Sequence, residues 1–386
     1  MYWGFNDVNN RAINLSGGWK IRLALGRALL RKPNILILDE PTNHLDINAS
    51  IWLYNYLENY KKTLIVITHQ IYLVNNIADI TYYIGNLKLN GNEIYTIRGD
   101  YDSYKQFVKN TKKEMDNEYN KFKKKIDEMK KKSTDKKVVQ EFVKKNNVVK
   151  PPKEYLVNID FVNISQFKNN DVIKLEDVSF GYDKDIFNNL NITIKTNDRI
   201  VLVGPNGIGK TSFFKLCSEK INPKSGYVIK NDKLRVGYYY QEIIDNLPLD
   251  KTPIEYLQSL DNEIDSGKCR GILGKLGLRK NEISDYPTIK IKNLSGGQKA
   301  RLSFASLQIL EPHLILLDEP SNHLDIESIE GLINGINNFN GAIVIITHDL
   351  YLIENINNSS IYELKNKNIN KFYGEFNDYC DHILNN

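Results

Sequence analysis

The sequence predicts an α/β protein with two related domains, the first incomplete, joined by a basic α-helical hairpin. Residues 15–47 match residues 294–326 at a constant offset of 279 positions, which indicates an internal repeat. The second repeat alternates apolar runs of strand length with helical segments, and a lysine-rich stretch separates the two repeats. We expect residues 1–104 to form the C-terminal part of a first domain, 105–170 the linker, and 171–386 a complete second domain.

The strands of the second repeat are expected at three apolar runs within residues 198–204, 313–320 and 342–349. Each run ends in polar residues, as is typical of central strands in a parallel sheet whose loops gather at one edge. The first repeat contains only the last two of these strands, and no counterpart of residues 198–204 precedes them. We expect the gap to leave an apolar sheet edge and face open to solvent or to another chain.

The linker is expected to form a charged helical hairpin. Residues 105–150 hold 16 lysines and seven acidic residues, a net charge of +9 in a chain of net charge +5. Turn residues at 132–135 separate two helical segments, and Pro151 and Pro152 end the second. The first helix is predicted from apolar positions three or four residues apart, namely Phe107, Thr111, Met115, Tyr119, Phe122, Ile126 and Met129, and the second from Val138, Phe142 and Val143. A solvated hairpin without an RNA partner is the alternative to a nucleic-acid-binding role.

A phosphate-binding loop is predicted at residues 204–211, where GPNGIGKT matches GxxxxGK[ST] between a strand and a helix. The glycines let backbone N–H groups surround phosphate oxygens, and the following helix N-terminus favours negative charge. Lys210 can reach the β- and γ-phosphates, and the Thr211 hydroxyl can bind Mg²⁺. The repeats are therefore predicted to be P-loop NTPase domains. The loop and its flank comprise Gly204, Pro205, Asn206, Gly207, Ile208, Gly209, Lys210, Thr211 and Ser212.

Acidic and histidine residues follow the next two strands. Asp318 is suited to hold Mg²⁺, and Glu319 to polarise the attacking water as general base. The same pair recurs as Asp39 and Glu40, which argues against a chance pair of exposed acids. His348 ends the following strand and is expected to contact the γ-phosphate.

Two further residues are candidates with structural alternatives. Gln241 could bind Mg²⁺ or the attacking water, and Tyr182, upstream of the phosphate loop, could stack on adenine. An ordinary core or surface role is nearly as frequent for a tyrosine in such a position.

Each repeat also has an LSGG segment that opens a helix. Ser16, Gly17 and Gly18 form the first, and a second signature consists of Ser295, Gly296 and Gly297. A hydroxyl and two glycines at a helix N-terminus offer a second anion site that no Cβ blocks. A single segment of this kind could be a helix cap, but both are followed about twenty residues later by a DEP strand end.

Together these motifs resemble ATP-binding cassette domains. Two DEPxNHLD stretches, at residues 39–46 and 318–325, resemble the ABC-F family in particular. The first repeat has Trp19 at the position where the second has Gln298, and PPKEY follows the linker at residues 151–155. Both features resemble the eukaryotic-type members of that family. The resemblance implies a soluble twin-cassette protein that acts on ribosomes, with a linker that approaches tRNA near the peptidyl-transferase centre. It also implies that ATP drives closure of the two cassettes.

In such proteins the cassettes pair head to tail, and each ATP lies between one phosphate loop and the other domain's LSGG. The resemblance therefore implies one composite site in this chain, made by Ser16, Gly17 and Gly18 with residues 204–211, Asp318, Glu319 and His348. Ser295, Gly296 and Gly297 would face a loop that the sequence does not contain, and Glu40 and His69 would have no nucleotide. We expect an N-terminally truncated sequence or a partner chain that completes the first cassette, and impairment of the ATPase is the expected cost.

Composition limits the remaining possibilities. Cys217, Cys269 and Cys380 lack CxxC spacing, which favours reduced thiols, and neither a secretory signal nor a membrane span is recognisable. We expect a cytoplasmic ATPase with ATP and Mg²⁺ as cofactors, acting on ribosomes in translation or its regulation, with rRNA and tRNA contacted by the linker. The alternatives are the coupling ATPase of a membrane transporter and a non-catalytic, nucleotide-gated scaffold in translation control.

Overall fold

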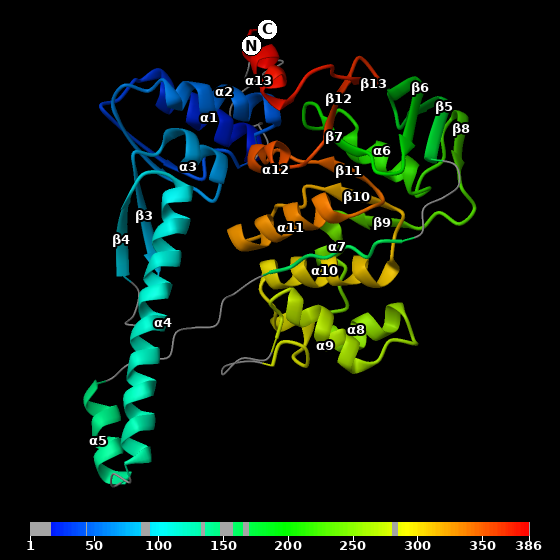
Figure 1. The fold of residues 1–386 in the computed structure, drawn as a ribbon. Coiled ribbons are helices and arrows are strands. Elements are labelled where there is room, and N and C mark those ends of the chain that lie inside the picture. The colour runs from blue at the N-terminus through cyan, green and yellow to red at the C-terminus, as the bar shows by residue number, and fades with distance from the viewer. Residues whose placement is uncertain are drawn as a thin grey trace. The chain divides into compact units, whose positions relative to one another are not determined.

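The computed structural model describes residues 17–43, 45–85, 93–132, 136–146, 157–164, 170–279 and 285–385, without the side chains of Ile21, Gln241 and Glu242. The chain divides into two compact units, one within residues 1–69 and 155–386 and the other within 70–154. Figure 1 gives the order of the elements along the chain.

The larger unit is built on a six-stranded sheet in the order β13-β12-β7-β11-β10-β9. The strands from β12 to β9 pair in parallel, and β13 pairs antiparallel with β12 at the edge. Their bounds are β7 Arg199–Val203, β9 Val236–Tyr239, β10 Leu314–Asp318, β11 Ala342–Ile346, β12 Ser360–Lys365 and β13 Asn368–Lys371. All five residues of β7 are buried, as expected for an apolar strand with a parallel partner on each side.

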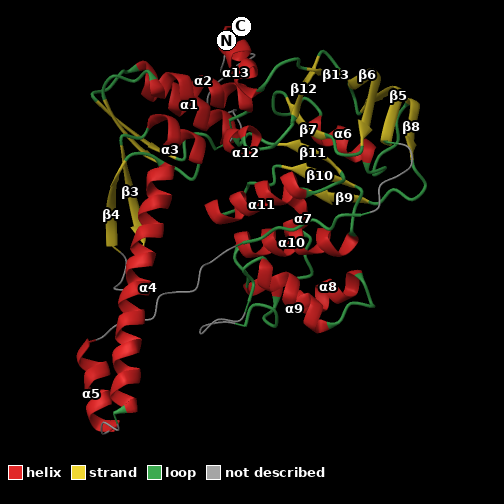
Figure 2. Cartoon of the chain, in the orientation of Figure 1, coloured by secondary structure: helices red, strands yellow, loops and turns green. Residues whose placement is uncertain are grey.

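A second, antiparallel sheet and a set of helices complete this part of the unit. The sheet has the order β6-β5-β8, with β5 Asp171–Gly181, β6 Asp185–Lys195 and β8 Ser225–Lys230. The helices are α6 Lys210–Cys217, α7 Gln241–Asp245, α8 Pro253–Leu260, α9 Ser266–Lys275, α10 Gly296–Leu310, α11 Ile326–Asn338, α12 Leu350–Glu354 and α13 Phe376–Asn385, with the 3-10 turn η2 Ile291–Asn293. Figure 2 shows α10 and α11 next to the strands, with α8 and α9 beyond α10. Phe187, Phe213 and Phe214 lie in the core cluster that joins α6 to both sheets.

The first repeat supplies α1 Gly17–Leu30, β1 Ile35–Asp39, α2 Ile47–Glu58 and β2 Thr63–Ile67 to the same unit. Strands β1 and β2 pair in parallel, in the register that β10 and β11 have 279 residues later. In the second repeat β11 pairs with β7 on its other side, whereas the described residues give β2 no partner except β1. Within the described residues the first repeat therefore has a two-stranded sheet, and its lack of a counterpart to β7 stays a prediction.

Residues at equivalent positions of β1 and β10, and of β2 and β11, differ in solvent exposure. Ile37 of β1 is 65% exposed, whereas Leu316, its equivalent in β10, is 0% exposed. Ile65 of β2 is 48% exposed, whereas the equivalent Val344 is fully buried. The open apolar face that the sequence predicts is therefore present on β1 and β2. The cause is the absence of packing partners, since the residues are as apolar as their buried counterparts.

The smaller unit contains α3 Ile71–Ile77, the antiparallel hairpin of β3 Ile80–Gly85 and β4 Glu93–Arg98, and the helices α4 Tyr101–Lys131 and α5 Lys136–Asn146. Asp100 caps α4 by accepting a hydrogen bond from the Ser103 backbone N–H at 2.9 Å, so this helix begins four residues before Lys105. Phe122 of α4 stacks on Phe142 of α5, with ring centroids 5.5 Å apart. No helix within the described ranges combines the length and the hydropathy that a bilayer crossing requires.

We expect the two repeats to respond differently to the same substitution. Leu316→Ala should lower the free energy of unfolding by about 2–5 kcal/mol because it leaves a cavity in a packed core. Ile37→Ala, at the equivalent position, should cost less than about 1 kcal/mol because its side chain lies mostly in solvent. Urea denaturation of both variants measures the difference, and equal losses would mean that Ile37 is buried in solution.

Candidate functional site

The phosphate loop joins the end of β7 to the start of α6. Gly204, Gly207 and Gly209 have φ angles of 147°, 78° and 118°, in the left-handed region that side chains with a Cβ rarely adopt. A Cβ on Gly209 would also lie 2.2 Å from Cγ2 of Ile186. The glycine positions of GPNGIGKT are therefore required by the backbone path, and the helix begins at Lys210 as the sequence predicts.

Lys210 lies inside this loop. Its ammonium group donates to the carbonyl oxygens of Gly204 at 2.6 Å and of Pro205 at 3.0 Å. Burial lowers the pKa of Lys210, and the carboxylates of Glu319, Asp46 and Asp318 act in the opposite direction. Asp46 belongs to the first repeat, so the electrostatics of this lysine already involve both repeats.

Thr211 and Asp318 bring two oxygen ligands together from α6 and β10. The Thr211 hydroxyl donates to Oδ2 of Asp318 at 2.9 Å. Burial raises the pKa of Asp318 to about 6, and the hydrogen bond from Thr211 opposes that rise. A hydroxyl beside a carboxylate at the mouth of a phosphate loop is a donor set suited to Mg²⁺, which prefers oxygen ligands and keeps several waters. The residues present therefore fit the metal ion that the sequence implies.

Glu319 and His348 form a pair at the ends of β10 and β11. Oε1 of Glu319 lies 2.9 Å from Nε2 of His348, and both side chains are mostly buried. The backbone of Glu319 is left-handed, with φ of 51°, and its N–H donates to the carbonyl of Ile346 at 2.8 Å. The turn that directs this carboxylate is therefore held by the neighbouring parallel strand, and it stores local strain.

Glu40 and His69 form the equivalent pair in the first repeat. Glu40 has φ of 43°, and its N–H donates to the carbonyl of Ile67 at 2.8 Å. His69 lies 3.5 Å from Glu40. Burial raises the pKa of Glu40, with His69 acting against the rise. The shared turn indicates that it is a property of the DEP segment and does not depend on the phosphate loop.

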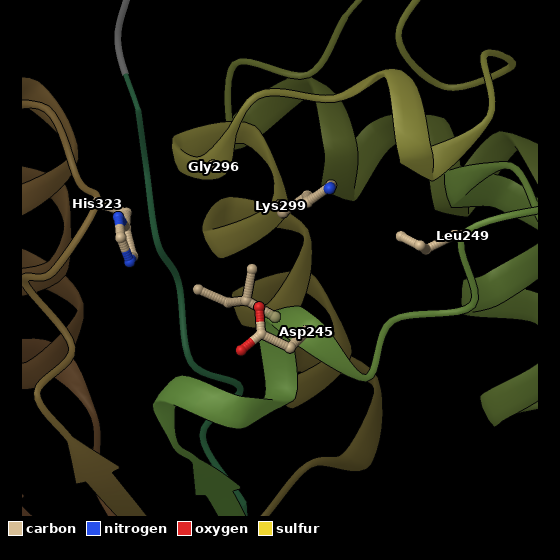
Figure 3. Close-up of a pocket in the computed structure, with 6 residues that line it drawn as sticks. Asp245, Leu249, Gly296, Lys299 and His323 are labelled. Atoms are coloured by element: carbon tan, nitrogen blue, oxygen red, sulfur yellow. The ribbon is translucent and has the colours of Figure 1, made fainter.

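The second signature begins α10. Ser295 is its N-cap and makes a reciprocal pair of hydrogen bonds with Gln298, at 3.3 Å and 2.9 Å. Gly297 faces the carbonyl oxygen of His323, which would lie 2.8 Å from a Cβ at that position. A cavity of about 290 Å³ opens beside this helix end, as Figure 3 shows. Its lining consists of Ile244, Asp245, Leu249, Gly296, Lys299 and His323.

The first signature differs in its capping. Ser16 lies outside the described residues, and Gly17 and Gly18 form the first turn of α1. Trp19 stands where Gln298 supplies the reciprocal cap, and its ring lies 4.8 Å from the guanidinium of Arg22. The place of these glycines in a composite site with residues 204–211 stays a prediction.

Two repeated ion pairs were missed by the sequence analysis. Arg22 of α1 lies 3.1 Å from Asp46, and Arg301 of α10 lies 3.2 Å from Asp325. Each aspartate also caps the helix that follows, α2 or α11. The pairs join each signature helix to the end of its DEPxNHLD segment. Their signal was an arginine and an aspartate that recur at the same offset of 279.

A third missed residue is Asp349, which follows His348. It is 5% exposed and caps α12 by accepting from the Leu352 backbone N–H at 3.2 Å. Burial raises the pKa of Asp349 to about 6, and a hydrogen bond from Ser321 of the DEPSNHLD segment opposes the rise. The contact joins the loops after β10 and β11. The sequence feature that could have indicated this role is that the first repeat has Gln70 at the position equivalent to Asp349.

Tyr182 and Gln241 remain untested candidates. The Tyr182 ring is 59% exposed and packs edge-on against Phe180, with centroids 5.2 Å apart. Such a ring leaves a face free for stacking. Gln241 begins α7 directly after β9, but its side chain is outside the described set.

The fold and this site define an ATP-binding cassette protein. The family model described as ABC transporter matches residues 3–43 and 187–322. The chain is 36% identical to ABC transporter F family member 4 of Dictyostelium discoideum over 98% of this chain and 34% of that protein. It is 36% identical to ABC transporter F family member 3 of Arabidopsis thaliana, over 97% and 53%, and 34% identical to Protein GCN20 of Saccharomyces cerevisiae, over 96% and 50%. The chain belongs to the F family of ATP-binding cassette proteins.

The chain spans about half or less of the length of these three relatives. Among solved structures, it matches the archaeal ribosome recycling factor aABCE1, in complex with the ribosomal stalk protein aP1, with a TM-score of 0.63 and 22% identity. That match covers 96% of this chain and 67% of the other. RNase-L Inhibitor matches with a TM-score of 0.61 and the same identity and coverage. These likenesses show the fold of ATP-binding cassette proteins.

The site predicts that only one of the two repeated glutamates is needed for hydrolysis. Glu319→Gln should lower the rate of phosphate release by about 10²–10⁴-fold because it removes the general base. Binding of ATP should persist, because Lys210 and the loop are untouched. Glu40→Gln is the matched control, and it should keep the rate within about twofold, since among the described residues β1 pairs only with β2 and no phosphate-loop strand lies beside Glu40. Single-turnover phosphate release measures both variants, and an equal loss in the control would contradict the assignment.

Proposed function

We propose that this chain binds and hydrolyses ATP at the site between β7, α6, β10 and β11. The observation that carries the proposal is the convergence of two pairs at one sheet edge: Thr211 with Asp318 at 2.9 Å, and Glu319 with His348 at 2.9 Å. A phosphate cradle, a set of oxygen ligands and a carboxylate base are the parts that phosphoryl transfer to water requires.

Each residue has a role in this reaction. The backbone N–H groups of residues 206–211 bind the phosphates, and Lys210 moves its hydrogen bonds from the loop carbonyls to phosphate oxygens. Thr211 and Asp318 would hold Mg²⁺, which neutralises charge on the transferred phosphoryl group. Glu319 accepts a proton from the attacking water, and His348 fixes the direction of that carboxylate.

We further propose that the first repeat completes this site through Ser16, Gly17 and Gly18. Contacts between the two repeats support the arrangement. The Tyr379 hydroxyl of α13 donates to Oδ1 of Asn48 in α2 at 3.3 Å, and Asp46 acts on the pKa of Lys210. The open face of β1 and β2 supports a partner polypeptide that supplies an apolar parallel strand like β7.

The linker suggests where the ATPase acts. α4 and α5 carry lysines along most of their exposed surface, and such helices bind an RNA backbone by charge with little sequence preference. The chain belongs to the F family, and its resemblance to that family implies action on ribosomes. Together with the lysine-rich helices, this membership supports action on ribosomal RNA or tRNA in translation or its regulation. ATP would bring the cassettes together, and hydrolysis would release them.

Ribosome co-sedimentation of the Glu319→Gln chain tests this proposal. Pelleting should require ATP and weaken as salt is raised, because each phosphate contact releases counterions. Replacing Lys123, Lys124 and Lys125 by Gln should reduce the slope of log affinity against log salt by up to about 3. The matched control replaces Lys365, Lys367 and Lys371, which lie on β12 and β13 and the turn between them, and should keep the slope.

Two results would contradict the ribosomal role. The chain could remain in the supernatant with ATP, or both lysine sets could change the slope equally. ATP-dependent pelleting with membranes instead of ribosomes would favour the transporter alternative.

A further inference from the structure

The segment that returns from the linker to the second cassette is seated along α11. We call residues 157–164 the strap. Val157, Ile159 and Phe161 are 4%, 1% and 6% exposed, although the strap lies outside every helix and strand. Alternate residues of an extended segment point the same way, so these three side chains form one buried row.

Two glycines of α11 make room for the strap. A Cβ on Gly331 would lie 2.2 Å from the carbonyl oxygen of Val157, and a Cβ on Gly335 would lie 2.0 Å from that of Ile159. Positions four residues apart share one face of a helix. The glycine face of α11 is therefore a groove in direct contact with the strap backbone, and any larger residue would displace it.

Polar contacts fix the strap at both ends. The Asn158 N–H donates to the Lys275 carbonyl at 2.8 Å, and the Asp160 carboxylate lies 2.9 Å from the Lys275 ammonium group. At the other end, the Asn340 side chain accepts from the Ile164 N–H at 3.2 Å and donates to the Ile164 carbonyl at 2.9 Å. These bonds satisfy backbone groups that a coil segment would otherwise expose to water.

The internal repeat shows that the groove is a feature of the second cassette alone. At the positions of Gly331 and Gly335, α2 of the first repeat has Trp52 and Tyr56. Their rings stack on each other with centroids 5.4 Å apart and fill the equivalent face. Two helices of common origin therefore differ at the two residues on which strap docking depends.

The opposite end of α11 reaches the nucleotide site. Asp325 is the last residue of the DEPSNHLD segment and the N-cap of α11, and Arg301 of the signature helix lies 3.2 Å from it. Lys275, which binds the strap, ends α9 in the same cassette. The Asn322 N–H donates to the Glu319 carbonyl at 3.2 Å, and the turn after Glu319 leads into α11, against whose glycines the strap packs. The strap follows α5 along the chain.

We propose that the strap is the positioning element by which the nucleotide state of the second cassette is transmitted to the linker hairpin. The inference rests on the proposed ATP binding. Because the described residues place this groove on α11, the return arm of the linker follows the second cassette, and its exit point moves when α11 moves. Gly331 and Gly335 are positioning residues and touch no reacting atom.

Hydrogen exchange of the full chain, in the Glu319→Gln background with and without ATP, tests the proposal. In the double variant Gly331→Ala and Gly335→Ala, amides of residues 157–164 should exchange about tenfold faster or more. The ATP-dependent change in exchange of α4 and α5 should disappear, while binding of labelled ATP stays within about twofold. The matched control is Gly271→Ala with Gly274→Ala in α9, where an added Cβ meets nothing within 4 Å.

A milder variant tests the proposal in case the glycine double variant does not fold. Asn340→Ala removes the two hydrogen bonds at the strap's far end, and it should reproduce the loss of coupling in part. The proposal is overturned if strap amides keep their protection in the glycine double variant. It is equally overturned if the hairpin still responds to ATP after the strap is released. Absence of labelled ATP binding in the parent chain would instead refute the proposed function, and strap docking would still be measured by exchange without nucleotide.

Discussion

The parallel pairing of β7 between β11 and β12 is the constraint on which the site depends. Because parallel strands end at the same edge, the loops after β7, β10 and β11 are brought together. One loop carries Lys210 and Thr211, the next carries Asp318 and Glu319, and the last carries His348. The distances of 2.9 Å within the two pairs follow from that edge. The left-handed turn at Glu319 is likewise held by a bond to Ile346 at the end of β11.

The described part of the first repeat shows which features form when β2 has no such strand beside it. β1 and β2 keep their parallel register, and Glu40 keeps its left-handed turn and its histidine partner. Burial of the sheet face is lost, because isoleucines equivalent to core residues of β10 and β11 lie open to solvent. Local backbone geometry therefore comes from the DEP segment itself, whereas the packed sheet comes from neighbours. The repeats also differ between the equivalent helices α2 and α11, since of these two it is α11 that has the glycine face against which the strap packs.

Sequence patterns predicted the residues of the phosphate loop, the DEP strand end and the following histidine as site residues, and the structure places Thr211 beside Asp318 and Glu319 beside His348. Motifs succeed here because each residue is required by local backbone geometry or by charge. The Arg22–Asp46 and Arg301–Asp325 pairs and Asp349 were missed because their roles come from burial, which a pattern of residue types does not reveal. The strap was missed for a related reason. Val157, Ile159 and Phe161 alternate over too few residues to stand out, and the glycines of α11 look unfavourable in a helix until their neighbour is known.

Counting the ATP molecules bound by the chain tests the central claim most directly. Equilibrium dialysis with labelled ATP and Mg²⁺ should give one nucleotide per chain, held by the single GxxxxGK[ST] loop in the sequence. Lys210→Ala should abolish binding at ATP concentrations that saturate the unaltered protein, because it removes the ammonium group held inside the phosphate loop. Binding that survives in Lys210→Ala, or a stoichiometry of two, would contradict a site built on β7 and α6.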